Sequence, residues 1–425
     1  MKSLFEKVNT RLNAQGGFLK SVSVLVGGTA FAQIIGLLCL PLLTRLYSPN
    51  DYSILGIYVA IVSIFAVISC FRFEIAIPIP EKDEEAKSLL FISLLSNIFT
   101  ILFLYLILLL VYPLIKNLHI IRQLSIWIWF IPLGVFLSGL YSALQYWSSR
   151  RKRFKEIAHT RMTQAILGNG ASLIVGITTG GFWGLIFGQL LNFSGGFLRL
   201  ANSTYHDLKI IKKTLPLKDV LYKYRDYPKY STFEALANIS AIQLPLIIIA
   251  SFVVGAEVGY LMLAMKILGI PMGLIGRAMS QVYLSHAPEF YKKKQLYRYT
   301  VDILKKIFKL IVIPFILLAM LSPYIFDFIF GENWSGLGKY ILIMIPWYFM
   351  QILSSPVSMA LHIIGSQKTA LSLQVFGFVM RVGILIIMAI IGSNYIVDYY
   401  IFSGFLFYLI YMLVIVKALR QEDIG

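Results

Sequence analysis

Charged residues are scarce in this chain. Asp, Glu, Lys and Arg together make up 14% of the 425 residues, whereas about a quarter is usual in a soluble protein. Apolar residues account for 58% of the chain, and its mean hydropathy is +0.77. Apolar stretches of about 18 or more residues recur from end to end and leave no room for a sizeable soluble domain. The composition therefore excludes a soluble protein and predicts an integral membrane protein.

Cysteine is scarce as well. The two cysteines, Cys39 and Cys70, both lie inside apolar runs, so neither is expected to bind a metal or to form a structural disulfide. The first apolar run, Val22 to Leu43, is too long for the hydrophobic core of a signal peptide and lacks a small-residue cleavage pattern. We expect it to be retained as a membrane span, and we expect no catalytic residues, metal or cofactor.

The alternation of apolar and polar residues that marks a membrane barrel strand is also lacking, since Ile101–Val111 is uniformly apolar. Backbone groups in lipid must bond internally, so the apolar runs are predicted to be helices. Breaks at Thr179-Gly180-Gly181 and at Gly255-Ala256 divide two runs that are too long for one crossing. We expect an all-α membrane protein with about twelve spans, at residues 21–44, 54–77, 88–112, 125–147, 158–178, 182–200, 232–254, 257–285, 302–330, 339–363, 369–392 and 396–417.

Positive charge is distributed unevenly between the predicted loops. The net charge is +18, but Lys and Arg cluster in short segments between spans, which argues against a nucleic-acid partner and for loops that face anionic lipid. With a cytoplasmic N-terminus, alternate loops hold 31 of the 38 cations inside and 4 outside. This bias predicts that both termini are cytoplasmic.

The longest polar segment, about residues 201–231, separates six predicted spans from six. This predicts an N-terminal lobe over residues 1–215 and a C-terminal lobe over residues 216–425. The second span of each half begins similarly, with Asp51–Gly56 in one and Glu257–Met262 in the other. A repeat about an axis along the membrane normal explains this likeness, and chance is the alternative.

Three local motifs resemble a known family. Leu43–Tyr52 (LTRLYSPNDY) resembles the first outer turn of bacterial polysaccharide flippases, and Arg72–Pro80 (RFEIAIPIP) resembles the end of their second span. Gly255–Tyr260, followed by Gly269-Ile270-Pro271, is similar to their eighth span. These are the Wzx-type O-antigen and capsule transporters of the multidrug/oligosaccharidyl-lipid/polysaccharide exporter superfamily.

The resemblance implies two six-helix lobes around a central cavity in the bacterial cytoplasmic (inner) membrane. It implies alternating-access transport of an undecaprenyl-pyrophosphate-linked oligosaccharide, coupled to a H+ or Na+ gradient. A polysaccharide polymerase and chain-length proteins are candidate partners. The sugar and the coupling ion stay open.

Two cations lie deep in predicted spans. Lys266 is about 13 Å along its helix and Arg381 about 18 Å along another. An unpaired charge near the bilayer centre costs about 3 to over 10 kcal/mol, so such residues face protein or water. We predict that both bind pyrophosphate oxygens in the cavity, and a buried structural ion pair is the alternative. Gly269, Pro271 and Gly273 are predicted to form a hinge beside Lys266.

Other candidates are less deeply placed. Arg72 and Arg277 either snorkel to headgroups or line the cavity mouth, and Arg45 in the first outer turn is assigned to the same substrate set. The candidate coupling acids are Glu74, Glu234 and Glu257, although Glu257 also suits a first helical turn. Capping boxes are expected at Ser48–Asp51 and at Ser231–Glu234. Trp147, Trp183 and Tyr260 are available to contact a sugar.

Two other functions compete with this interpretation. A multidrug exporter of the same superfamily would favour acids in its cavity, whereas the mid-span charges here are basic. A membrane polysaccharide polymerase or ligase would need a large outer region or an acidic cluster. The outer loops here are short, and Phe330–Trp334 carries one acid.

The charge bias predicts a specific labelling pattern. In a background with both cysteines replaced by serine, Lys116→Cys should react with a membrane-impermeant maleimide in intact cells. Arg225→Cys should react only after permeabilisation, because the basic loops are predicted to be cytoplasmic. The opposite pattern would show that the predicted orientation is wrong.

Overall fold

The computed structural model describes residues 17–211, 213–253 and 255–424, and within them every regular element is a helix. This confirms the predicted all-α fold. The helices pack as two compact units. Unit 1 comprises the described residues up to Tyr47 together with Ile54–Gln243, and unit 2 comprises Ser48–Ser53 and the described residues from Leu244 onward. The division between the units thus falls inside helix α11 (Thr232–Phe252), whereas the sequence predicts a division after residue 215.

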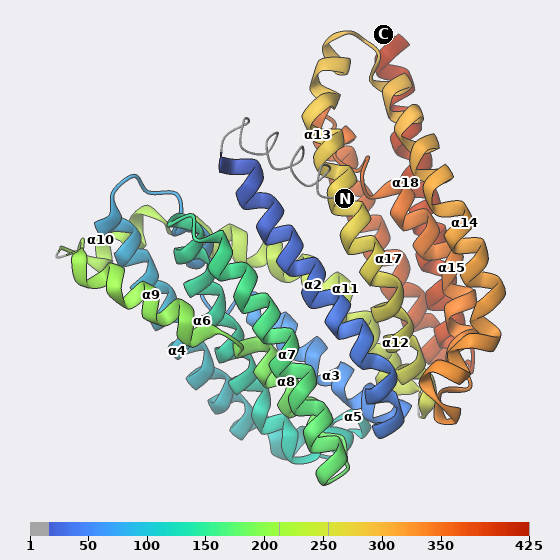
Figure 1. Cartoon of the computed structure of the whole chain (residues 1–425), viewed down its shortest axis with the longest axis horizontal. Coiled ribbons are helices and arrows are strands. Elements are labelled where there is room, and N and C mark those ends of the chain that lie inside the picture. Colours follow the sequence, from blue (N-terminus) through green and yellow to red (C-terminus); the bar gives the residue numbers. More distant parts are fainter. Residues whose placement is uncertain (1–16, 212, 254, 425) are drawn as a thin grey trace, which may run out of the picture. The chain divides into compact units, whose positions relative to one another are not determined.

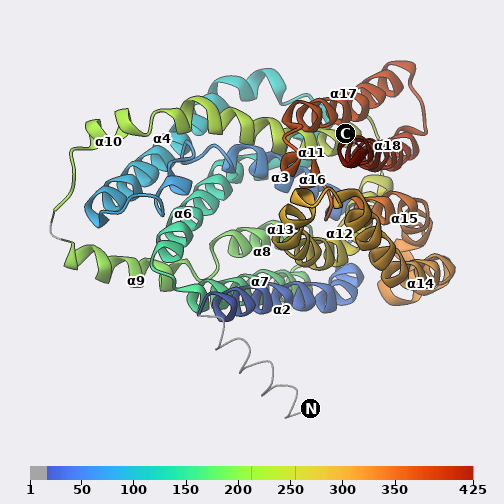
Figure 2. The ribbon, with the colours of Figure 1, turned by 90° about the horizontal axis from the view of Figure 1, so that it is seen from above.

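Unit 1 is built around α6 and α7. Helix α7 packs against α2 and α8, and α6 packs against α4, α8 and α9 (Figures 1 and 2). Close α7–α8 packing depends on Gly168, Gly184 and Gly188, each of which lies where a Cβ would collide with the facing helix. The helices are α2 (Gly17–Leu46), α3 (Pro49–Ala66), α4 (Asp83–Ile115), α5 (His119–Leu124), α6 (Ile131–Arg150), α7 (Phe154–Thr178), α8 (Trp183–Ser194), α9 (Phe197–Ile210), α10 (Leu217–Lys223) and α11 (Thr232–Phe252), which continues into unit 2.

Unit 2 is built around α15, which packs against α12, α14 and α18, while α17 packs on α18 (Figure 2). Its helices are α12 (Ala256–Pro271), the π-helical turn η4 (Met272–Gly276), α13 (Arg277–Lys292), α14 (Leu296–Phe330), α15 (Leu337–Ser354), α16 (Ala360–Ile363), α17 (Gln367–Ile391) and α18 (Ile396–Ile424).

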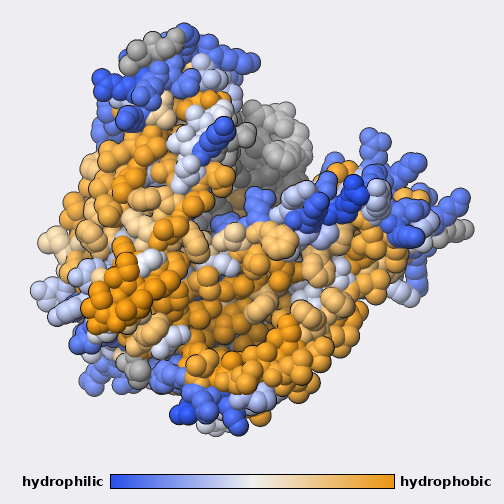
Figure 3. Space-filling model, turned by 180° about the vertical axis from the view of Figure 1, so that it is seen from behind, coloured by the Kyte–Doolittle hydropathy of each residue, from blue (hydrophilic) through white to orange (hydrophobic). Residues whose placement is uncertain are grey.

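The outer surface suits a lipid environment. Within the described residues, eight helical segments are long and apolar enough to cross a membrane, and the other predicted spans also coincide with helices. Large apolar side chains such as Leu110, Phe328 and Ile390 are more than 60% exposed. In Figure 3 apolar residues cover the flanks of the helices on this face, and hydrophilic residues gather at helix ends. The protein is therefore a multi-pass membrane protein.

The two predicted glycine turns are confirmed. Helix α7 ends at Thr178 and α8 begins at Trp183, with positive φ angles at Gly180 (63°) and Gly181 (97°) between them. Gly255, with φ 119°, precedes α12. Side chains with a Cβ rarely adopt these conformations, so glycine allows the chain to turn back here.

Of the two predicted capping boxes, one is correct and one is wrong. The Ser48 backbone N–H donates to Asp51 Oδ2 (2.8 Å), and the Asp51 N–H donates to Ser48 Oγ (3.3 Å), which fixes the start of α3. No such cap forms at Ser231, because a π-helical turn over Tyr227–Ser231 runs directly into α11.

Two other predicted spans end early. The predicted span 182–200 stops at Ser194, because Gly196 with φ 77° turns the chain into the amphipathic helix α9. The predicted span 339–363 is α15, which ends at Ser354, followed by turns and the short helix α16. The predicted span 54–77 is also interrupted, and its break contributes to the candidate site below.

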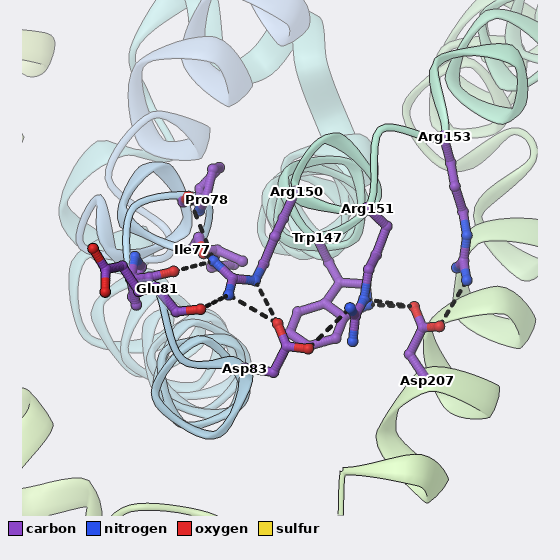
Figure 4. Close-up of polar contacts among 10 residues, drawn as sticks. Ile77, Pro78, Glu81, Asp83, Trp147, Arg150, Arg151, Arg153 and Asp207 are labelled. Atoms are coloured by element: carbon purple, nitrogen blue, oxygen red, sulfur yellow. Dashed lines mark hydrogen bonds and ion pairs between the residues drawn. The ribbon is translucent and has the colours of Figure 1, made fainter.

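An arginine cluster follows the end of α6 (Figure 4). Arg150 donates to Asp83 Oδ1 (2.8 Å) and to the backbone carbonyls of the segment between η1 and α4, including Pro80. Arg153 pairs with Asp207 on α9 (2.6 Å), and Arg151 contacts both aspartates (3.0 and 3.5 Å). The cluster thus joins the ends of α4, α6 and α9.

Trp147 belongs to this cluster. Its side chain is fully buried, and its Nε1–H donates to Asp207 Oδ2 (2.9 Å). The expectation that Trp147 is available to a sugar is therefore wrong, because its polar atom and its ring are both enclosed by protein.

Further contacts attach the chain after α9 to α4. The Lys87 ammonium donates to the carbonyls of Leu208 (3.2 Å) and Ile211 (2.7 Å), which lie at the C-terminus of α9 where carbonyls lack helical partners. Lys223 on α10 pairs with Glu85. Burial, together with a hydrogen bond to Glu85, raises the pKa of Tyr224 to about 12.

Arg150→Ala should destabilise unit 1. Its guanidinium satisfies several carbonyls and Asp83 at once, and hydrogen bonds to charged groups contribute about 1.5–3 kcal/mol each. We expect the Tm in detergent to fall by about 4–8 °C. Arg122→Ala is the matched control, because Arg122 makes a single exposed hydrogen bond to Asn117. Equal Tm changes in the two variants would contradict a structural role for the arginine cluster.

Candidate functional site

The break in the predicted span 54–77 is the first feature of the candidate site. Helix α3 ends at Ala66, and residues 67–80 run through turns and the short 3-10 helix η1 (Phe73–Ala76). Two successive non-glycine residues there, Phe71 (φ 48°) and Arg72 (φ 63°), are left-handed, a conformation that costs energy and often occurs at functional sites.

Neighbouring helices contact the segment at the break through one of its backbone carbonyls and one of its side chains. Thr100 Oγ1 on α4 donates to the Ser69 carbonyl (2.9 Å), and Cys70 Sγ lies 3.6 Å from the Gly139 carbonyl on α6. Irregular backbone at membrane depth is tolerated only where protein or a watery cavity provides partners. The sequence analysis missed this break because residues 67–70 are apolar or small and carry no glycine or proline.

The break holds a buried ion pair. Arg72 Nη1 lies 3.7 Å from Glu74 Oε1, and the side chains are 25% and 6% exposed. Arg72 Nε and Glu74 Oε2 are buried without a hydrogen-bond partner in the described part of the chain. These two atoms can therefore still form hydrogen bonds with a ligand or with water.

The second feature is an arginine surrounded by aromatic rings in unit 2. The Arg381 guanidinium carbon lies 4.7 Å from the ring centre of Phe407, 5.3 Å from that of Tyr408 and 5.5 Å from that of Trp347. These rings come from α15 and α18, and their faces attract the cation. Arg381 Nε and Nη2 are buried and have no hydrogen-bond partner among the described residues. We call Arg381 and these three rings the aromatic box.

Helix α15 connects the aromatic box to the region of Lys266. Tyr348, next to Trp347 in the chain, donates its hydroxyl to the Met265 carbonyl on α12 (3.3 Å). The next residue, Lys266, is exposed. Lys266 lies on α12 and Arg381 on α17, and both helices belong to unit 2.

The predicted hinge residues lie where helix geometry changes. Gly269 and Pro271 fall in the last turns of α12, and Gly273 lies within the π-helical turn η4. A Cβ at Gly269 would meet no neighbouring atom within 4 Å, so close packing does not require glycine there. A loosened turn of this kind often marks a functional segment.

The remaining candidates lie apart from these features. Arg45 is exposed in the last turn of α2, and Glu234 and Glu257 are exposed in the first turns of α11 and α12. Arg277 begins α13, and its side chain lies outside the described residues. In the described part of the chain, no group of three or more His, Cys, Asp or Glu residues could hold a metal ion.

Comparison with known proteins places the chain in a family. A family model described as "Polysaccharide biosynthesis protein" matches residues 42–339. The chain belongs to the polysaccharide biosynthesis protein family. The predicted family resemblance is thereby confirmed, since the match includes the three motifs on which it rests. No curated protein shows a significant match.

Solved structures show the fold of this polysaccharide biosynthesis protein. The lipid II flippase MurJ, in an inward closed conformation, aligns with a TM-score of 0.72 at 16% identity, covering 94% of this chain and 90% of MurJ. An inward-facing multidrug resistance MATE family transporter of the MOP superfamily aligns at 0.65 and 15% identity, covering 94% and 96%. A MOP superfamily transporter from Pyrococcus furiosus aligns at 0.56 and 14% identity, covering 94% and 96%. The chain therefore has the fold of MOP superfamily transporters.

Arg381→Met should leave the stability unchanged or increase it. A buried guanidinium with unsatisfied N–H groups costs energy, and replacing such a charge by an apolar residue of similar length is often neutral or stabilising by about 1–4 kcal/mol. We expect the Tm in detergent to stay equal or rise by a few degrees. Arg161→Met is the control, because Arg161 also lies over one ring, that of Tyr141, but donates to Gln145 Oε1 (2.8 Å), so its loss should lower the Tm. A large decrease for Arg381→Met would show that Arg381 is a structural residue.

Proposed function

We propose that the protein flips an undecaprenyl-pyrophosphate-linked oligosaccharide repeat unit from the cytoplasmic to the periplasmic leaflet by alternating access. The polymer would be O-antigen (lipopolysaccharide), capsule or another surface polysaccharide, and the location the bacterial inner membrane. The observation that carries this proposal is the basic character of the mid-span charges in a chain of the polysaccharide biosynthesis family with a transporter fold. A cationic lining suits a pyrophosphate and opposes a cationic drug.

In this proposal Lys266 and Arg381 attract the pyrophosphate. Arg presents a planar fork that can bind two phosphate oxygens, and its buried Nε and Nη2 still have hydrogen bonds to give. The three aromatic rings attract the guanidinium through cation–π contacts. These contacts do not use the N–H groups as hydrogen-bond donors, so the N–H groups can still bind phosphate oxygens. Lys266, on α12, adds a flexible point charge.

The π-helical turn next to Lys266 supports a moving segment. Met272–Gly276 interrupts the regular hydrogen bonding between α12 and α13, so bending there disrupts fewer bonds than elsewhere in the helix. We assign Gly269, Pro271 and Gly273 to the hinge. Arg72, Arg277 and Arg45 are assigned to the substrate path. Glu74, the buried acid at the break after α3, is the first candidate for H+ or Na+ coupling, ahead of the exposed Glu234 and Glu257.

The likeness to a MATE family transporter supports a multidrug exporter as the second candidate function. That function would favour acids in the transport path, and Glu74 is buried. Arg72 lies beside it, however, and neutralises its attraction for a cationic drug.

Lys266→Ala and Arg381→Met should abolish surface polysaccharide while the protein stays in the membrane. Lipid-linked repeat units should accumulate in the cytoplasmic leaflet, inaccessible to an external lectin until the cells are permeabilised. Lys368→Ala and Arg122→Ala, which remove exposed cations at helix ends, serve as matched controls and should keep normal polymer.

The outcomes separate the candidate functions. Single repeat units exposed on the outer face of a deletion strain would indicate a polymerase or ligase rather than a flippase. Normal polysaccharide in the deletion strain together with increased drug sensitivity would favour the multidrug exporter. Normal polymer in both site variants would show that the site assignment is wrong.

A further inference from the structure

A groove lies on unit 2 between α14, α15 and α18. It has a volume of about 280 Å³ and is lined by Val301, Leu304, Lys305, Phe308 and Lys309 of α14, by Leu353 of α15 and by Met412 of α18. The lining atoms are apolar, so the two lysines contribute their methylene stems to the wall. Long basic side chains commonly place the stem on apolar surface and the charged end in water.

The depth of the groove follows from the register of two helices. The Tyr297 backbone N–H, at the start of α14, donates to Asp423 Oδ2 near the end of α18 (2.8 Å). Lys305 and Lys309 lie about 12 and 18 Å from Tyr297 along α14, and Met412 lies about 16 Å from Asp423 along α18. The groove therefore begins about one turn inside the start of α14, at Val301, and extends to about three turns inside the helix ends, at Lys309 and Met412.

The charge at this depth is positive. Lys305, Lys306 and Lys309 are exposed within little more than one turn of α14. Asp302 is the acid on the same stretch, so the stretch keeps a net charge of +2. Beyond the lysines, α14 continues with exposed apolar residues such as Leu310 (58%) and Ile313 (63%). Positive charge thus lies at the border between a polar and an apolar surface.

We propose that this groove binds an anionic phospholipid of the surrounding leaflet. The phosphate lies between the ammonium groups of Lys305 and Lys309, and one acyl chain lies over Phe308 and Met412. Two lysines one turn apart match a single phosphate, and the apolar wall continues from them into the lipid-facing surface of the same helix. The proposal concerns the bilayer and does not depend on the proposed transport function.

Lipid retention by the full-length protein in detergent provides the test. After exposure to equal amounts of phosphatidylglycerol and phosphatidylcholine, native mass spectrometry should show a preference of about thirtyfold for phosphatidylglycerol, the size expected for two lysines near a phosphate. Lys305→Gln/Lys309→Gln should abolish this preference. Lys292→Gln/Lys293→Gln is the charge-matched control outside the groove and should keep it.

A second variant distinguishes the contribution of the groove to lipid binding from that of the lysine charges. Val301→Trp keeps both lysines and fills the groove, so it should reduce phosphatidylglycerol retention as strongly as the lysine variant does. Equal retention of both lipids by the native protein, or unchanged preference in both groove variants, would overturn the proposal. Displacement of phosphatidylglycerol by an equimolar amount of undecaprenyl phosphate would also overturn it, because the groove would then take a polyprenyl lipid.

Discussion

Polar groups inside an apolar helix bundle need a partner, and this single constraint explains most of the unusual features of the molecule. Water in a loop can satisfy a carbonyl or a guanidinium, whereas hydrocarbon cannot. The chain meets the constraint with side chains from neighbouring helices. Thr100 bonds the broken end of α3, and Lys87 bonds the last carbonyls of α9. Arg150 donates hydrogen bonds to backbone carbonyls of the segment before α4.

The two candidate sites are places where this constraint is met only in part. Glu74 and Arg72 pair with each other, yet each keeps a buried atom without a partner in the described residues. Arg381 is held by ring faces, and its buried Nε and Nη2 have no hydrogen-bond partner in the part of the chain that the structure describes. A carboxylate with both oxygens paired, such as Asp207, which accepts from Trp147 and Arg153, holds helices together. Partly paired groups at membrane depth are better suited to receiving a ligand.

The comparisons and the geometry inform different aspects of function. Structures at 15–16% identity show that the chain folds as MOP superfamily transporters do, but many functions can share one fold. The family match places the chain in polysaccharide biosynthesis. In the function that we propose, the sign of the mid-span charges links the two, because a pyrophosphate-linked substrate needs cations along its path.

The sequence by itself determined the helical membrane fold, the turns at Gly180 and Gly255, the capping box at Ser48 and the family. The length of an apolar run, the position of a glycine and hydrogen bonds between residues close in the chain are local properties. They can therefore be predicted without knowing which helices pack nearby. Tertiary structure alone decided the break after Ala66, because the stabilising groups come from α4 and α6. It also decided the surroundings of Arg381, whose three rings are separated from it by at least 26 residues. The same holds for the pairing of Asp207 with Arg153, because no local pattern specifies which distant side chain will meet a charge.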